Sequence, residues 1–101
     1  MKIAINACYG SFGLSEKALA LLKQRGLDKV DRWGNNVSRD DPRLISVIEE
    51  LGHEASRVGE NVVIIEIPDG VTDWYIQDYD GYETVSEGRV WRYEDNEDEE
   101  V

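Results

Sequence analysis

The chain has 101 residues with 22 acidic and 11 basic side chains, a formal net charge of −11, and 41% hydrophobic residues. This length and composition predict one globular domain that folds without disulfides, and the single Cys8 excludes an internal one. The acidity disfavours direct binding to nucleic acid or to an anionic membrane, because both need basic surfaces. No apolar run reaches the roughly 20 residues of a membrane helix, and the N-terminus does not resemble a secretory signal, so we expect a cytoplasmic protein.

The acidic side chains gather in the second half of the chain. Eight acids and no Lys or Arg lie between Arg57 and Arg89, and residues 94–101 add six acids without a base. We therefore expect residues 1–93 to form the domain and residues 94–101 to form an acidic tail, which can serve binding or only solubility. A basic protein surface is the partner that this charge permits. The oligomeric state stays open, a homodimer included.

The first half of the chain predicts a strand followed by two helices. Residues 2–8 alternate in a period of two, which indicates a strand. After a glycine-containing loop, Ser15 is a suitable N-cap for a helix over residues 16–25. A polar connection follows, and then Asp41 and Pro42 mark the N-terminus of a second helix with one apolar face.

The second half predicts strands. The β-branched run at 62–67 indicates a buried central strand, and we expect the first strand to lie beside it. Two further strands are expected over 72–77 and 82–87, joined by a hairpin at 78–81. The order β-α-α-β-β-β predicts an α+β fold, a small mostly antiparallel sheet with two helices on one face. Residues 89–93 add a last short strand.

The loop between the first strand and the first helix is one candidate site. A strand–glycine loop–helix junction can direct backbone N–H groups at an anion such as the phosphate of a nucleotide. The Lys and Ser/Thr of a Walker loop do not follow Gly13, so a sharp turn is the favoured alternative. The candidate ligand-binding residues are Gly10, Ser11, Phe12, Gly13 and Ser15.

Catalytic and metal-binding patterns are weak. Cys8 near a helix N-terminus could be a nucleophile with His53 as its base, although a small buried Cys and an exposed His is the simpler interpretation. One Cys and one His do not make a zinc site, and the segment at 78–81 lacks the later ligands of a calcium loop. We predict no metal, no cofactor and no catalytic residue, and an enzyme is the less favoured class.

Aromatic residues crowd into twenty positions near the C-terminus: Trp74, Tyr75, Tyr79, Tyr82, Trp91 and Tyr93. A small domain needs some of them in its core, yet both parities of the expected strand over 72–77 carry an aromatic side chain. Exposed aromatic side chains with acids around them are typical of protein-binding surfaces. Core and binding patch therefore stay equally open, and the candidate patch is Asp73, Tyr75, Asp78, Tyr79, Asp80, Tyr82 and Glu83.

Three stretches carry a family resemblance: INACYGSFGLSEKAL (5–19), RDDPRLISVIEELG (39–52) and EIPDGVTDWYIQDYDGYETVSEGRVW (66–91). Together they resemble a family of small proteins encoded by bacteriophages and prophages, with an N-x-C-[YF]-G-G-F-G-L-S loop and an E-I-P-D…Y-D-G-x-E segment. Ser11 stands where a glycine is usual, and the acidic tail is a second departure. The resemblance implies a phage origin and an accessory role, and no activity or catalytic residue is carried over.

These observations lead to two main hypotheses of function. The favoured one is a small acidic accessory protein of phage type in the host cytoplasm. It would bind a host or phage protein without catalysis, for example as a charge mimic of nucleic acid in host takeover or counter-defence. The alternative is a protein that binds a small molecule or nucleotide with the loop from Gly10 to Ser15. An enzyme that uses Cys8 ranks third.

Overall fold

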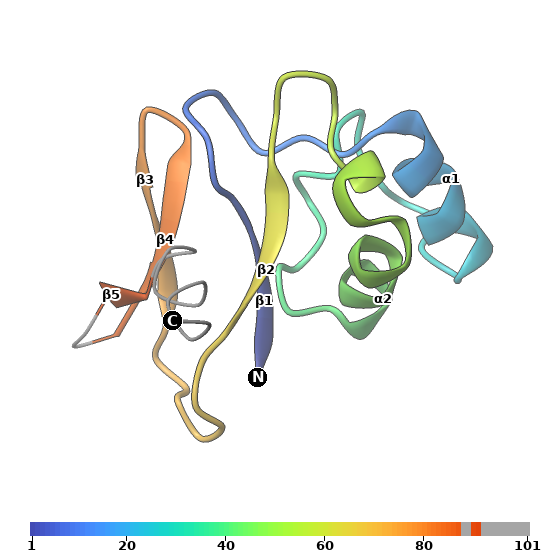
Figure 1. The fold of residues 1–101 in the computed structure, drawn as a ribbon. Coiled ribbons are helices and arrows are strands. Elements are labelled where there is room, and N and C mark those ends of the chain that lie inside the picture. Colours follow the sequence, from blue (N-terminus) through green and yellow to red (C-terminus); the bar gives the residue numbers. More distant parts are fainter. Residues whose placement is uncertain (88–89, 92–101) are drawn as a thin grey trace.

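The structure is a computed structural model that describes residues 1–87 and 90–91. The elements follow the predicted order and confirm the α+β class (Figure 1). In chain order they are β1 (Lys2–Asn6), α1 (Glu16–Gln24), α2 (Pro42–Leu51), the 3-10 helix η1 (Gly52–Ala55), β2 (Val62–Glu66), β3 (Tyr75–Tyr79), β4 (Tyr82–Ser86) and β5 (Val90–Trp91). In this described part of the chain no helix is long and apolar enough to cross a membrane. Most of the expected strand at 89–93 and the tail at 94–101 lie outside the described residues.

The strands form two antiparallel sheets, so the prediction of a single sheet was wrong. β1 pairs with β2, as expected, and β3, β4 and β5 pair in that order. The outer edge of β1 is closed to a further strand because other groups occupy its amides. The Ala4 N–H donates to the Arg39 carbonyl at 2.9 Å, and the Asn6 N–H donates to the Glu83 carboxylate at 2.7 Å.

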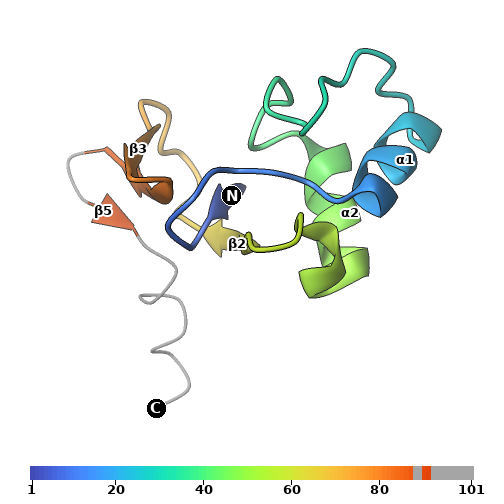
Figure 2. The same cartoon turned by 90° about the horizontal axis from the view of Figure 1, so that it is seen from above.

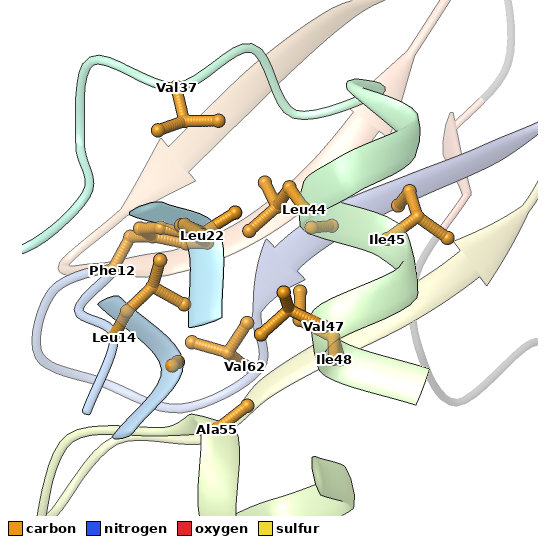
Figure 3. Packing of buried hydrophobic residues seen from close by; sticks show 12 residues of the cluster. Phe12, Leu14, Leu22, Val37, Leu44, Ile45, Val47, Ile48, Ala55 and Val62 are labelled. Atoms are coloured by element: carbon orange, nitrogen blue, oxygen red, sulfur yellow. The ribbon is translucent and has the colours of Figure 1, made fainter. Parts of the chain in front are cut away.

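The β1–β2 ribbon lies between the helices and the three-stranded sheet (Figures 1 and 2). Side chains on one face of the ribbon, including Ala4 and Val62, pack under α1 and α2, and Figure 3 shows this helical core. Side chains on the other face, including Ile3, Ile5 and Ile65, pack against β4 and β5. Both faces of the ribbon are therefore buried, which explains its almost continuous apolar sequence.

Both predicted helix caps are present. The Ser15 side chain accepts a hydrogen bond from the Ala18 N–H at 3.1 Å, and the Asp41 side chain accepts one from the Arg43 N–H at 2.8 Å. Each side chain satisfies a backbone donor that the first helical turn leaves without a partner. The Ser15 cap fixes the start of α1, and it thereby fixes the length of the loop that connects β1 to α1.

The β3–β4 hairpin turns more tightly than predicted. Asp80 and Gly81 form a two-residue turn with φ values of 52° and 91°, the geometry of a type I′ turn. β3 therefore begins at Tyr75, three residues later than expected, and ends at Tyr79. Alternation along the strands then points Tyr75, Gln77 and Tyr79 away from the β1–β2 ribbon.

Candidate functional site

The glycine loop between β1 and α1 is closed by hydrogen bonds within the chain. Four of its amides donate to other parts of the molecule: Gly10 to the Asp80 carbonyl at 2.9 Å, Ser11 to the Glu60 carboxylate at 3.2 Å, Leu14 to the Trp33 carbonyl at 3.0 Å and Ser15 to the Ala55 carbonyl at 2.9 Å. Phe12 is buried in the helical core. These N–H groups do not converge on an open space, as a phosphate site requires.

The anion beside the loop is the chain's own Glu60 carboxylate. It accepts from the Ser11 N–H and from Arg57 Nη2 at 2.7 Å, and its side chain is almost fully buried. The hydrogen bond from Arg57 lowers the pKa of Glu60, so this carboxylate is charged at neutral pH. A Cβ at Gly10 would lie 2.9 Å from Glu60 Oε2, so glycine allows this close approach.

Cys8 does not have the surroundings of an activated thiol. The Cys8 thiol lies within hydrogen-bond distance of Asn6 Oδ1 at 3.3 Å, Glu60 Oε2 at 3.6 Å and the Gly59 carbonyl at 3.7 Å, and no bond to His53 is present among the described residues. Partial burial raises the pKa of the Cys8 thiol, and the Glu60 carboxylate raises it further. A nucleophilic cysteine needs the opposite shift, because the thiolate is the reactive form.

Glu83 was predicted to belong to an exposed acidic patch, and this was wrong. Its side chain is only 6% exposed and forms two hydrogen bonds with the Arg39 guanidinium, at 2.6 and 3.0 Å. The Arg39 guanidinium also lies 3.7 Å from the centre of the Phe12 ring. Glu83 points inward because it shares the parity of the buried Val85 in β4. The pair joins β4 to the edge of β1, where Glu83 accepts the Asn6 N–H.

The tip of the β3–β4 hairpin packs directly on the glycine loop. The Asn6 side-chain amide donates to the Gly81 carbonyl at 2.9 Å, next to the bond between the Gly10 N–H and the Asp80 carbonyl. A Cβ at Gly81 would lie 1.6 Å from the Gly10 carbonyl oxygen, so the two backbones meet with no room for a side chain. This contact brings Tyr9 beside the hairpin.

The outer surface of the three-stranded sheet carries exposed tyrosines. Tyr9 is 68% exposed, Tyr75 is 56% exposed and Tyr79 is 73% exposed. The Tyr9 ring lies 6.4 Å from the Tyr79 ring in an edge-to-face arrangement and 5.5 Å from the Tyr82 ring, centre to centre. A groove of about 520 Å³ is lined by Tyr9, Gln77, Asp78, Tyr79, Tyr82, Thr84 and Val90, and Tyr75 lies outside this lining. We call this surface the tyrosine face: Tyr9, Tyr75, Gln77, Tyr79, Tyr82 and Val90.

Alternation divides the aromatic cluster between core and surface. Trp91 is buried and Trp74 is half-buried against the second core, whereas Tyr75 and Tyr79 are exposed on the outer face. Tyr93 lies outside the described residues. Sequence reasoning missed Tyr9, because it lies in the glycine loop, and only the docking of the hairpin brings it to the other tyrosines.

The unpaired negative charge near the tyrosine face is smaller than the eight acids between Arg57 and Arg89 imply. Of the eight acids between Arg57 and Arg89, Glu60 pairs with Arg57, Glu83 pairs with Arg39 and Asp69 pairs with the N-terminal ammonium group. Asp73, Asp78 and Asp80 are exposed around β3, as predicted for the patch. The Asp78 carboxylate also accepts the Gly81 N–H at 2.7 Å, which supports the turn.

Residues 1–87 and 90–91 hold no group of three His, Cys, Asp or Glu side chains that could bind a metal ion. Comparison with protein-family models, curated proteins and solved structures found no match for the chain. The resemblance to phage proteins therefore stays a prediction.

Proposed function

We propose that this chain is a non-catalytic binding protein whose tyrosine face contacts a basic surface of a partner protein. The observation that carries the proposal is the exposure of Tyr9, Tyr75 and Tyr79 on the outer face of the sheet, where Tyr9 and Tyr79 also line a groove with Tyr82. Tyrosine gives a large contact area at a low cost in conformational entropy, and it is common in interfaces for that reason.

Electrostatics select a basic partner. Asp73, Asp78 and Asp80 lie around β3, and no Lys or Arg occurs between Arg57 and Arg89. A cationic side chain of the partner would be attracted by these carboxylates and could lie over a tyrosine ring. Because Glu60 and Glu83 are already paired within the chain, the tyrosines are the larger part of the proposed contact.

The biological setting is part of the same proposal. The resemblance to phage-encoded proteins supports a host or phage protein as the partner, in the host cytoplasm, with a role in host takeover or counter-defence. In the charge-mimic version of this proposal, the exposed carboxylates of this chain would occupy the sites on a basic protein that normally bind nucleic-acid phosphates. The alternative of a nucleotide site from Gly10 to Ser15 gains no support from the closed loop.

The test is capture of proteins from a bacterial lysate by the full chain. A double variant, Tyr75→Ala with Tyr79→Ala, removes the centre of the tyrosine face. Val58→Ala is the matched control, since Val58 is almost fully exposed but lies before β2. We expect a basic protein to bind the wild type and the control and to be lost from the double variant. Its capture by the wild type should weaken as the salt concentration rises toward about 1 M, where the screening length is about 3 Å. Equal capture by the double variant would contradict the proposal.

A further inference from the structure

β3 is an edge strand, and its outer side faces no other strand of the described residues. The two-residue turn makes Tyr79 and Tyr82 the hydrogen-bonded pair that closes the hairpin. In an antiparallel ladder such pairs alternate, so Gln77 and Tyr75 also bond to β4. The backbone N–H and C=O groups of Ile76 and Asp78 therefore point outward, away from β4.

Within residues 1–87 and 90–91, the charged Asp78 is the one feature of this edge that usually protects an edge strand. Proteins otherwise place lysine, proline or a bulge on such edges, or cover them with another segment. β3 has the sequence YIQDY and a regular register with β4, and both helices lie on the far side of the β1–β2 ribbon (Figure 1). The edge of β1 differs, because Arg39 and Glu83 occupy its backbone groups.

We propose that β3 accepts an extended, basic segment of the partner as a fourth strand of the sheet. This deepens the proposed function and rests on it. Main-chain hydrogen bonds to Ile76 and Asp78 would hold the segment, and its alternate side chains would lie on the tyrosine face. Neighbouring strands are about 4.8 Å apart, so a Lys or Arg on that side reaches the rings of Tyr75 and Tyr79.

The charges around the edge favour a basic segment over a second copy of this chain. Asp73 precedes β3, Asp78 lies within it and Asp80 follows it. Two copies joined edge to edge would bring these carboxylates together, which is unfavourable. Five residues of β3 span about 17 Å, which matches a segment of five to seven residues.

The experiment measures amide hydrogen exchange of the full chain by NMR, with and without a synthetic peptide of alternating Lys or Arg and Val. On binding, we expect the amides of Ile76 and Asp78 to exchange at least about tenfold more slowly, because they become hydrogen-bonded. The Gln77 amide already bonds to β4 and changes little. Asp73→Lys should weaken binding about threefold to tenfold, whereas Glu16→Lys, on the exposed side of α1, should not.

Two N-methylated peptides complete the test, each methylated at one of the two sets of alternate residues. Strand addition requires that N-methylation of one set abolishes binding and that N-methylation of the other set does not. Only the N–H groups of one set point toward β3 and form hydrogen bonds with it. If both bind, and Ile76 and Asp78 stay unprotected, strand addition is wrong while the binding of a basic protein by the tyrosine face stands. If no peptide binds, strand addition is also wrong, and lysate capture still decides the proposed function. Protection of both amides in concentrated protein alone would identify a second copy as the occupant and overturn the proposal.

Discussion

The glycine loop and the β3–β4 hairpin have similar residues and opposite roles. Both contain glycine and aromatic residues, and they meet at the contact between Gly10 and Gly81. Four amides of the loop and the neighbouring carboxylate of Glu60 are hydrogen-bonded within the chain, and the Phe12 ring is buried; Tyr9 is the exposed side chain that the loop adds to the tyrosine face. The hairpin also anchors its backbone, but it leaves its tyrosines in solvent. Residue types alone did not distinguish a closed site from an open one. The difference comes from the segments of the chain that pack against each region.

The largest effect should come from breaking the buried ion pair between Arg39 and Glu83. Glu83→Ala leaves the Arg39 guanidinium largely buried without its partner, and such a loss typically costs about 3–5 kcal/mol. Asp73→Ala is the control, because this exposed acid belongs to the same base-free stretch and should change stability by less than about 0.5 kcal/mol. The free energy of unfolding in urea measures both. Equal values for the two variants would show that Glu83 is not buried as described.

A side chain at the contact between the two regions should be nearly as harmful. Gly81→Ala places a Cβ against the Gly10 carbonyl oxygen and also demands a positive φ, so we expect a loss of roughly 3 kcal/mol. Gly70→Ala shares the positive φ but has open space around the added Cβ, and it should lose only about 1 kcal/mol. Thermal and urea unfolding of the two variants separate the clash from the backbone strain. Similar losses would mean that the hairpin tip does not pack on the loop.

A smaller, pH-dependent effect should come from the carboxylate beside the loop. The pKa of Glu60 is lowered from its ordinary value of 4.5, so the folded state binds its proton less readily than the unfolded state. Its stabilising contribution is therefore fully present above pH 4.5 and is lost as the pH falls through the lowered value. Glu60→Gln should cost about 1–2 kcal/mol at neutral pH and flatten the acid limb of the stability curve. Glu16→Gln, at an exposed position, is the control, because Asp41, Glu54 and Asp69 also have lowered pKa values and contribute to the acid limb in both variants. An acid limb in Glu60→Gln as steep as that of Glu16→Gln would contradict the assignment.

The smallest stability effect should belong to the tyrosine face. Tyr79→Ala removes a ring that is mostly in solvent, so unfolding should change by less than about 0.5 kcal/mol. Phe12→Ala, the matching aromatic of the loop, should cost about 3–5 kcal/mol because its ring is buried. Binding of the basic peptide should show the opposite order, with at least about a fivefold loss for Tyr79→Ala. A large stability loss for Tyr79→Ala would place its ring in the core and remove the proposed interface.

Local signals in the sequence predicted much of the fold. The Ser15 and Asp41 caps and the pairing of the first strand with the apolar run depend on short patterns, and all are present. In the two-sheet arrangement the edge of β1 is occupied by Arg39 and Glu83, which are 44 residues apart, and no local pattern reveals this pairing. The tyrosine face escaped prediction in part for the same reason. Tyr9 joins it only because the Gly10–Gly81 contact places the loop beside the hairpin.

The most direct measurement of the difference between the two regions is an NMR titration of the full chain with the Lys/Arg–Val peptide, followed by amide chemical shifts. We expect the shifts to concentrate on Tyr9 and on residues 75–79, and the amides of residues 11–15 to remain unchanged. The largest shifts at residues 11–15 would contradict the assignment, because they would show that the glycine loop, and not the tyrosine face, is the open site.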